Sequence, residues 1–266
     1  MKLSIITINY NHAADLSKTI QSVKNQTWKN FEYIIIDGGS TDESVAIIQH
    51  HKRDIAYWVS ERDKGVFHAM NKGIEKASGE YLLMLNAGDY LCDSSVLERV
   101  FGSNIYHEDI LTGDVYREED GKIFEKSCFP DVLTFNLFRK GSLCHQGTFI
   151  KRQLHELIGL YDEDLKYSSD WKFFVLAICK YNVSYKHVPC FIAVCDCGGL
   201  TCNPGNFSAM KKENEQVLKH YFPAFLHDYS HLDQIKNREL KSQLLSLWRD
   251  SKLLLKSWFL KASLRG

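Results

Sequence analysis

The sequence predicts an α/β protein whose mostly parallel sheet is flanked by helices and followed by a helical C-terminal extension. Three observations predict this fold. Short apolar, β-prone runs alternate with helical stretches over the first third of the chain, and such alternation is typical of βαβ units. Each apolar run ends at a polar loop, which places these loops on one edge of the sheet. From residue 206 onward the pattern is almost wholly helical.

The chain opens with two units of strand, loop and helix. In the first, the β-prone run Leu3–Ile8 precedes a helical stretch at Ala14–Gln26. In the second, the apolar run Phe31–Ile36 leads through the polar loop 37–42 into a helix at Glu43–His51. The two glycines of that loop allow the backbone to approach a ligand closely.

A third unit and a fourth strand complete this half of the chain. Ala56–Ser60 is a short strand, and the helix Val66–Ala77 follows its loop with apolar residues at helical spacing. Tyr81–Leu85 is an apolar run that ends at the polar turn 86–89, which predicts a buried strand followed by a tight loop. Ligands of open α/β sheets bind at this edge, so Asp89, the last residue of the turn, is a candidate site residue.

Beyond Asp89 the pattern predicts a mixture of short strands and helices. The predicted helices are Ser94–Phe101, Arg152–Gly159 and Trp171–Tyr181, and the predicted strands are Ile110–Tyr116, Lys122–Lys126, Gly147–Lys151, Val183–Val188 and Phe191–Cys197. The first two of these strands have a turn-forming sequence between them and are expected to form a hairpin.

The composition excludes several classes of protein. The 33 basic and 33 acidic residues cancel, so no overall field attracts nucleic acid. The apolar run at the amino terminus is too short, and too often interrupted by polar residues, to be a secretory signal. No run approaches the roughly 18 apolar residues of a membrane-spanning helix. We therefore expect a cytoplasmic protein whose eight cysteines are reduced thiols.

The last segment, residues 236–266, is basic and amphipathic in composition. Its eight lysines and arginines exceed its two acidic residues by six, and they alternate with leucines and two tryptophans. This composition is typical of a helix that lies on a membrane surface. A tail that packs on its own domain or on a partner chain has similar features, so both interpretations stay open.

Four aspartates follow strands or strand-like segments: Asp37, Asp63, Asp89 and Asp170. A single carboxylate at a strand end usually caps a helix. Carboxylates at successive turns of one parallel sheet instead converge on one site. From spacing alone, Asp170 is equally consistent with an N-cap on the helix that begins at Trp171.

This arrangement suits a sugar nucleotide. Asp37 and Asp63 offer acceptors for the N–H and O–H groups of a base and ribose, and Tyr10 offers a ring for stacking. The diphosphate needs neutralising charge, which Mg²⁺ or Mn²⁺ provides by bridging carboxylate and phosphate oxygens. Lys64 and Lys72 add positive charge nearby.

Several motifs occur in an order that resembles the family 2 glycosyltransferases of the GT-A fold. The motifs are NYN at 9–11, IIIDGGSTDES at 34–44, SERDKGVFHAMNKGI at 60–74, LLMLNAGD at 82–89 and SSDW at 168–171. The resemblance covers roughly residues 1–200 and is greatest to bacterial enzymes that build exopolysaccharide, capsule and O-antigen. Each motif alone is weak, and their order carries the resemblance.

The resemblance implies roles for individual residues. Tyr10, Asp37 and Asp63 would contact the nucleoside. The donor-binding positions it implies also include Ile8, Lys64, Lys72, Asn86 and Ala87. Asp89 would bind the metal, at the place of the family's Asp-x-Asp motif, and Asp170 would be the general base. The sequence departs from that motif, because Asn86 and Gly88 stand where aspartates are common.

The resemblance also implies a reaction and a domain organisation. An inverting enzyme would transfer a sugar, most often from UDP, to a hydroxyl of a glycan or lipid-linked acceptor. Residues 1–205 would form the GT-A domain, with a nucleotide-binding half at 1–90 and an acceptor half at 91–205. Residues 206–266 would form a helical extension. The missing aspartates keep open an alternative, a catalytically weak protein that only binds sugar nucleotides.

Other interpretations have less support. An NAD-dependent oxidoreductase lacks its G-x-G-x-x-G after the first strand, and a P-loop enzyme lacks G-x4-G-K-[ST]. The four cysteines at 190, 195, 197 and 202 do not have the paired spacing of common zinc sites. His145, in the sequence His-Gln-Gly before a predicted strand, either is structural or approaches the diphosphate or acceptor.

Overall fold

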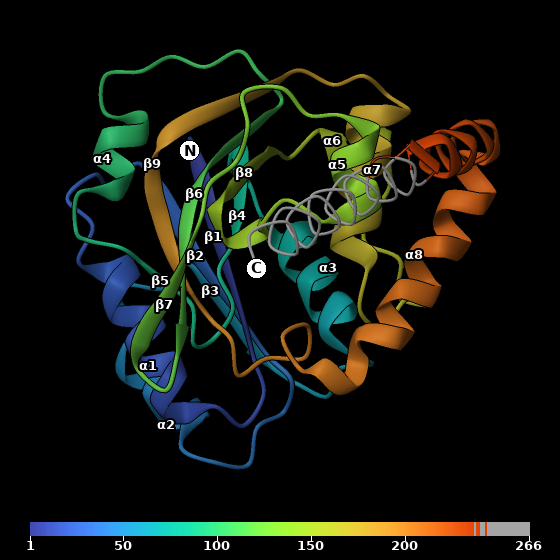
Figure 1. Ribbon diagram of the computed structural model, residues 1–266. Coiled ribbons are helices and arrows are strands. Elements are labelled where there is room, and N and C mark those ends of the chain that lie inside the picture. Colours follow the sequence, from blue (N-terminus) through green and yellow to red (C-terminus); the bar gives the residue numbers. More distant parts are fainter. Residues whose placement is uncertain (237, 240–242, 244–266) are drawn as a thin grey trace, which may run out of the picture. The chain divides into compact units, whose positions relative to one another are not determined.

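The computed structural model describes residues 1–236, 238–239 and 243 of the chain (Figure 1). The chain divides into two compact units, Met1–Glu213 and Asn214–Gly266. The first unit holds the sheet and all candidate site residues. The boundary that the sequence analysis places between residues 205 and 206 stays a prediction.

One sheet of nine strands runs through the first unit. Its order is β3 (Tyr57–Ser60), β2 (Phe31–Asp37), β1 (Leu3–Asn9), β4 (Tyr81–Met84), β8 (Thr148–Lys151), β6 (Ile110–Glu119), β9 (Tyr185–Asp196) and β5 (Tyr90–Leu91), and β7 (Lys122–Ser127) pairs with β6. The first four strands in this order are parallel. The next strand, β8, is antiparallel to both β4 and β6. The predicted mostly parallel α/β sheet is confirmed.

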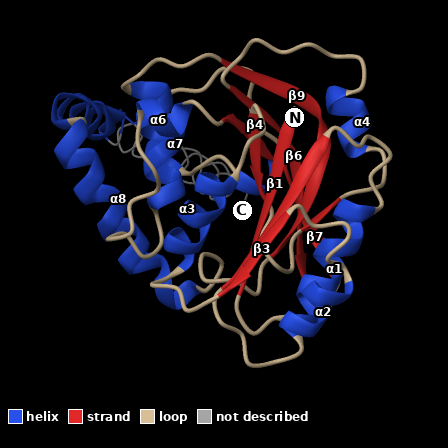
Figure 2. Ribbon diagram, turned by 180° about the vertical axis from the view of Figure 1, so that it is seen from behind, coloured by secondary structure: helices blue, strands red, loops and turns tan. Residues whose placement is uncertain are grey.

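Helices cover both faces of this sheet (Figures 1 and 2). One face carries α1 (Ala13–Lys24), α2 (Ser44–His50) and α4 (Val96–Phe101), and the other carries α3 (Val66–Lys76), α6 (Leu154–Leu157) and α7 (Ser169–Cys179). A helix α5 (Phe135–Lys140) and a 3-10 turn η1 (His145–Gly147) lie between β7 and β8 in the chain. The central strands are buried on both sides, which explains their continuous apolar sequences.

The inner strands show how the two faces are filled. Ile5 of β1 belongs to the apolar cluster that also contains Leu16 and Ile20 of α1. Its neighbour Ile6 points to the other face, where a Cβ placed on Gly73 of α3 would lie 2.4 Å from Ile6 Cγ2. The absence of a side chain at Gly73 therefore allows α3 to pack closely on β1.

Two predictions for the second half were wrong in detail. The two strands expected at Val183–Val188 and Phe191–Cys197 form one strand, β9, whose pairing with β6 skips from Val188 to Phe191. Pro189 lies in this gap, and proline has no N–H to donate to a ladder. The helix expected at Arg152–Gly159 is only the single turn α6.

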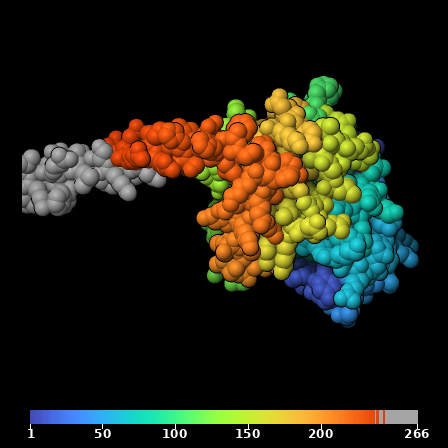
Figure 3. Space-filling model, turned by 90° about the vertical axis from the view of Figure 1, so that its right-hand side faces the viewer, coloured from blue at the N-terminus to red at the C-terminus, as the bar shows by residue number. Residues whose placement is uncertain are grey.

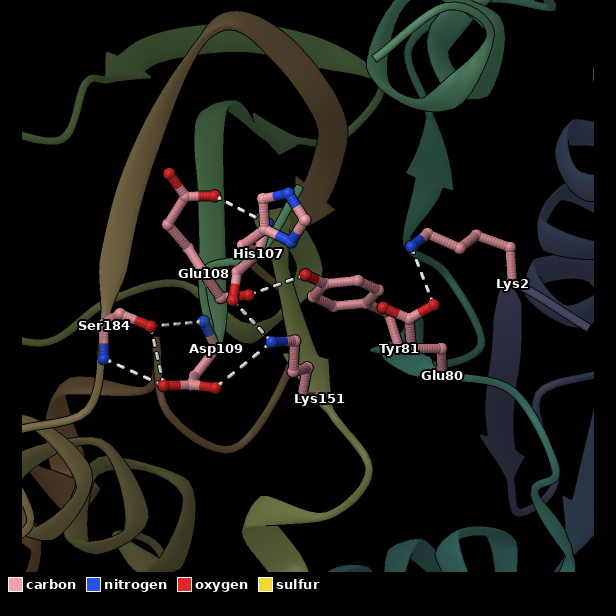
Figure 4. A network of polar contacts seen from close by, with 8 residues as sticks. All are labelled: Lys2, Glu80, Tyr81, His107, Glu108, Asp109, Lys151 and Ser184. Atoms are coloured by element: carbon pink, nitrogen blue, oxygen red, sulfur yellow. Dashed lines mark hydrogen bonds and ion pairs between the residues drawn. The ribbon is translucent and has the colours of Figure 1, made fainter. Parts of the chain in front are cut away.

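Polar side chains at the edge where the parallel strands begin are paired with one another (Figure 4). Lys2 forms an ion pair of 2.7 Å with Glu80, and the Tyr81 hydroxyl donates to the Glu108 carbonyl. Asp109 accepts from Ser184 and pairs with Lys151. These contacts join the segments before β1, β4, β6 and β9, so this edge is closed by structural interactions.

The C-terminal region begins with α8 (Phe207–Tyr221), which spans the boundary between the two units. Residues 223–236 are also helical, and the space-filling view in Figure 3 draws this part of the chain in orange to red. The basic segment 236–266 lies almost entirely outside the described residues. Within the described residues, no helix has the length and apolar character needed to cross a membrane.

Candidate active site

The opposite edge of the sheet collects the predicted site residues. Strands β1 to β4 all end there because they are parallel. Strand β8 begins there because it is antiparallel to β4, so the η1 turn before it lies at the same edge. The loops after β1 to β4 and the η1 turn together form the candidate site.

Asp37 ends β2 and is completely buried. One carboxylate oxygen accepts from Asn9 Nδ2 at 2.7 Å and from the Ser40 hydroxyl, and the other accepts from the Ser40 N–H and the Ser60 hydroxyl. Burial alone would raise the pKa of Asp37, but these hydrogen bonds outweigh it and lower the pKa below its ordinary value. The carboxylate is thus fully used in holding the loops that follow β1, β2 and β3.

Tyr10, Gly38 and Asp63 come together beside this loop. A Cβ placed on Gly38 would lie 3.1 Å from Asp63 Oδ2 and 3.2 Å from Tyr10 Cδ2. The Tyr10 side chain is exposed. Asp63 Oδ1 binds Lys72 and His68 at 2.6 and 3.2 Å, whereas Oδ2 has no hydrogen-bond partner among the described residues. An exposed ring and a free carboxylate oxygen thus flank one glycine.

The two predicted lysines differ in their surroundings. Lys72 Nζ lies 2.8 Å from Glu61 and 2.6 Å from Asp63, so its charge is paired within the loop after β3. Burial lowers the pKa of Lys72, but the two carboxylates outweigh it and raise the pKa above its ordinary value. Lys64 is exposed and is the lysine of this loop that can meet a diphosphate.

The turn Asn86–Asp89 is fixed from two sides. The Ala87 N–H donates to the carbonyl of Ile8, whose side chain is buried, and this bond extends the pairing of β1 with β4. Thr19 of α1 accepts from the Gly88 N–H at 3.1 Å and donates to the Asp89 carbonyl at 2.7 Å. Gly88 has φ +102°, a conformation that side chains disfavour, which explains why no aspartate stands there.

Asp89 is 4% exposed and its two carboxylate oxygens each accept one hydrogen bond. Oδ1 accepts from the backbone N–H of Asp196, and Oδ2 accepts from Gln146 Nε2, both at 3.0 Å. Burial raises the pKa of Asp89 to about 6, although His145 and the hydrogen bonds act in the other direction. A nearby positive charge would therefore be needed to keep Asp89 fully ionised.

Asp170 lies in the first turn of α7 and faces the η1 turn. The N-cap of α7 is Ser168, so Asp170 is not the cap that its spacing also allowed. Asp170 Oδ2 lies 3.1 Å from His145 Nδ1, and His145 Nε2 lies 3.3 Å from the side-chain nitrogen of Asn86. His145 thus lies between Asp170 and the turn that contains Asp89.

Trp171, the next residue of α7, anchors this helix end. Its indole Nε1 donates to the backbone carbonyls of Phe138 and Gly141, at 2.9 and 3.1 Å. Trp171 is buried, so these two bonds also satisfy a donor that has no access to water.

Comparison with known proteins agrees with this geometry. The family model described as glycosyl transferase family 2 matches residues 4–171.

The chain belongs to glycosyl transferase family 2.

Its relatives support this membership. A PGL/p-HBAD biosynthesis glycosyltransferase of Mycobacterium tuberculosis is 34% identical over 175 residues, which are 64% of this chain and 67% of the relative. The uncharacterised glycosyltransferase YwdF of Bacillus subtilis is 26% identical over 204 residues, 71% of this chain and 72% of YwdF. The chain is therefore an enzyme of the glycosyltransferase class.

Solved structures share its fold. Residues 1–349 of S. aureus TarS superpose with a TM-score of 0.63 at 19% identity, over 83% of this chain and 70% of the TarS chain. The mannosyltransferase PcManGT of Pyrobaculum calidifontis superposes with a TM-score of 0.53 at 18% identity, over 73% of this chain and 56% of PcManGT. The predicted GT-A fold is confirmed.

Within the described residues of this family 2 glycosyltransferase, no group of three or more His, Cys, Asp or Glu side chains is arranged to hold a metal ion. Asp89 offers one carboxylate, and a Cβ on Gly88 would lie 3.5 Å from Asp196 Oδ2. These residues fit a divalent cation that takes most of its oxygen ligands from a bound diphosphate and from water.

Several residues of the family 2 glycosyltransferase site were missed in the sequence. Asn9, Ser40 and Ser60 hold Asp37, and Thr19 and Gln146 hold the turn with Asp89. Ser40 and Asn9 lie inside the motifs that carry the family resemblance, so they could have been predicted as site residues from the sequence. Thr19 lies in an ordinary amphipathic helix and gave no signal. Among the described residues, the four cysteines at 190–202 belong to no group of three or more side chains placed to hold a zinc ion.

Replacing Tyr10 by alanine is expected to raise the donor KM of this glycosyltransferase about 5- to 10-fold with kcat within twofold. Stacking of an aromatic pair contributes about 0.5–1.5 kcal/mol to binding. None of the contacts described above joins Tyr10 to Asp170, so kcat should be little affected. Initial rates over a range of donor concentrations measure both constants. Tyr181→Ala, another exposed tyrosine, serves as the control. A lower kcat at unchanged KM would contradict the assignment.

Proposed function

We propose that this protein is an inverting glycosyltransferase that moves a sugar from UDP to a hydroxyl of a glycan or lipid-linked acceptor, in the synthesis of a cell-surface polysaccharide. The observation that carries the proposal is His145, which bridges Asp170 and Asn86 and so joins a carboxylate to the turn of the Asp-x-Asp position. A structure of TarS holds UDP-GlcNAc, which supports a sugar nucleotide as the donor. The mycobacterial relative is named a PGL/p-HBAD biosynthesis glycosyltransferase, which supports sugar transfer in a biosynthetic pathway.

The donor would lie along the ends of β1 to β4. Tyr10 would stack on the uracil, and Asp63 Oδ2 would accept from a uracil or ribose donor. Asp37 would act through the loop it holds, because its four acceptor positions are already occupied. Lys64 would face the diphosphate, while the backbone of Ile8, Asn86 and Ala87 would border the sugar.

Asp170 would take the proton of the acceptor hydroxyl. Its Oδ2 is held by His145, and no described residue bonds its Oδ1, which leaves that oxygen for the acceptor. As the acceptor oxygen bonds to the anomeric carbon, the bond to the diphosphate oxygen breaks and its electron pair leaves with UDP. Attack from the face opposite the diphosphate inverts the configuration.

Asp89 would hold Mg²⁺ or Mn²⁺ against the diphosphate. When bound, the cation stabilises the negative charge that develops on the leaving group. Gln146 and the Asp196 N–H fix the Asp89 carboxylate, and Thr19 fixes its backbone. With one carboxylate and no preformed cluster in the described residues, the site should bind the cation together with the nucleotide.

Thermal unfolding tests this order of binding. Mn²⁺ alone should shift Tm by less than about 1 °C, whereas UDP with Mn²⁺ at about 100 times Kd should raise Tm by about 5–10 °C. GDP and dTDP with Mn²⁺ are the matched comparisons for the nucleoside. An equal shift with Mn²⁺ in the absence of any nucleotide would show a preformed metal site and contradict this prediction.

Turnover tests the function itself. Purified protein with Mn²⁺ is assayed for UDP release and for glycosylated product with a panel of UDP-, GDP- and dTDP-sugars and lipid-linked acceptors. A second candidate, a protein that binds sugar nucleotides without transfer, is favoured by Asn86 and Gly88 in place of aspartates. Nucleotide binding with no turnover of any donor would favour this second candidate.

We also propose that the basic segment 236–266 attaches the enzyme to an anionic membrane surface. Its composition supports this, with eight basic residues among leucines and tryptophans. The full chain should sediment with vesicles containing phosphatidylglycerol and not with purely phosphatidylcholine vesicles. Lys252→Glu with Lys256→Glu should abolish sedimentation, and Lys29→Glu should not. Equal sedimentation of both variants would contradict the proposal.

A further inference from the structure

His145 occupies a position between the two halves of the candidate site. Its Nδ1 lies 3.1 Å from Asp170 Oδ2 and its Nε2 lies 3.3 Å from the Asn86 side-chain nitrogen. The next residue, Gln146, donates to Asp89. Two consecutive residues thus contact the proposed base, the donor turn and the proposed metal ligand.

The η1 turn holds His145 rigidly. The Gly147 N–H and the Thr148 hydroxyl both donate to the Cys144 carbonyl. A Cβ placed on Gly147 would lie 2.6 Å from Val115 Cγ1 and 2.9 Å from the Gly113 carbonyl, so the turn packs directly on β6. The imidazole therefore has a fixed base from which to orient Asp170.

Hydrogen-bond complementarity places a proton on Nδ1 of His145. Because a carboxylate only accepts, Nδ1 must donate its proton to Asp170. The Asn86 amide can serve either state of Nε2: its nitrogen donates to an unprotonated Nε2, and after a half-turn its Oδ1 accepts from a protonated one. The neutral imidazole and the imidazolium thus both keep the bond to Asp170.

The charges around His145 favour its protonated form. Burial lowers the pKa of His145, but the hydrogen bond and charge of Asp170, with further contributions from Cys144 and Asp89, outweigh it and raise the pKa to about 9. A bound diphosphate would bring further negative charge to this edge.

We propose that His145 is a positioning residue of the transfer reaction: its Nδ1–H holds Asp170 Oδ2 and so leaves the other carboxylate oxygen directed to the acceptor. This inference rests on the proposed function of Asp170 and adds the group that prepares it. His145 needs no contact with the substrate for this role.

The test compares two variants of His145. His145→Ala removes both the N–H donor and the charge, and should lower kcat about 10- to 100-fold with donor KM within twofold. In His145→Asn the amide nitrogen takes the place of Nδ1, so it keeps the donor and loses the charge. At pH 8 the kcat of His145→Asn should be higher than that of His145→Ala, by at least half of the difference in log kcat between His145→Ala and the wild type.

Binding of UDP with Mn²⁺ is measured in both variants and should be unchanged. The matched control is His187→Ala. His187 lies 2.9 Å from Asp114, with both side chains slightly more buried than those of the His145 pair, and near the end of β9 that is remote from Asp196. His187→Ala should keep its kcat.

A measurement without turnover separates this inference from the proposed function. In protein with ¹⁵N-labelled histidine, the His145 imidazole should titrate at lower pH in Asp170→Asn than in the wild type. If the wild type transfers no sugar, the proposed function fails and this titration still tests the pair. The inference is overturned if the titration is unchanged, if His145→Ala keeps kcat within twofold, or if His145→Asn recovers none of the activity that His145→Ala loses.

Discussion

Asp170→Asn is expected to lower the rate of sugar transfer about 10²- to 10⁴-fold, with the donor KM within about twofold. The amide has nearly the size and shape of the carboxylate and can still contact His145, so the turn and helix should keep their positions. It cannot take the proton of the acceptor hydroxyl. Product formation with a saturating acceptor measures kcat, and binding of UDP with Mn²⁺ measures the donor site independently.

Asp109→Asn is the matched control for this loss. Asp109 is similarly exposed and is also paired, with Lys151, but at the edge where the parallel strands begin. Its replacement should leave kcat within twofold while lowering Tm by a few degrees at most. If Asp170→Asn kept the wild-type rate, Asp170 would not be the base, and the transfer mechanism proposed for this site would have to be abandoned.

Asp89→Asn is expected to lower metal-dependent transfer about 10²- to 10³-fold, which corresponds to the several kcal/mol that a bound cation contributes to leaving-group stabilisation. An amide keeps the size of the side chain but binds Mn²⁺ far more weakly than a carboxylate. Raising the Mn²⁺ concentration should recover little activity. The rate is measured against Mn²⁺ concentration at saturating UDP-sugar.

The Tm of Asp89→Asn shows whether its lower activity comes from weaker metal binding or from unfolding. The pKa of Asp89 in the folded protein, about 6, is above the value of about 3.9 in an unfolded chain. The folded state therefore favours the protonated form, and this contribution to stability is present below about pH 4 and lost as pH rises through 6. The asparagine variant should have a Tm at pH 7 equal to or above that of the wild type. A lower Tm at pH 7 would make the lost activity a folding defect.

The placement of the proposed donor residues was predictable because the sequence indicated both the direction of the first four strands and their burial. Apolar runs such as Leu3–Ile8 are buried on both faces, and strands separated by helices are parallel. Their ends must then meet at one edge, which brought Tyr10, Asp63 and Asp89 to that edge. The loops themselves carried the family motifs.

The state of each carboxylate was not predictable. Asp37 was expected to face the nucleoside, and its oxygens accept four hydrogen bonds, two from Ser40 of the same loop and two from the distant residues Asn9 and Ser60. Lys72 was expected to add charge at the diphosphate, yet it is paired with Glu61 and Asp63. Such pairings depend on ångström-scale placement of loops, which strand and helix patterns do not determine.

The role of the η1 turn depended on the direction of one strand. A short apolar run such as that of β8 has the same pattern whether it is parallel or antiparallel. Because β8 is antiparallel to β4, the residues before it lie at the edge where the parallel strands end. His145 and Gln146 therefore reach Asp170 and Asp89 from a position that strand-end rules for parallel sheets do not cover.

The two bonds of Trp171 have a consequence for how the sequence that supports α7 can diverge. Both go to backbone carbonyls, those of Phe138 and Gly141, and neither depends on the side chains of these two residues. The support of the first turn of α7 can therefore be retained in homologous enzymes that differ at both positions, provided that the backbone path of the segment is kept.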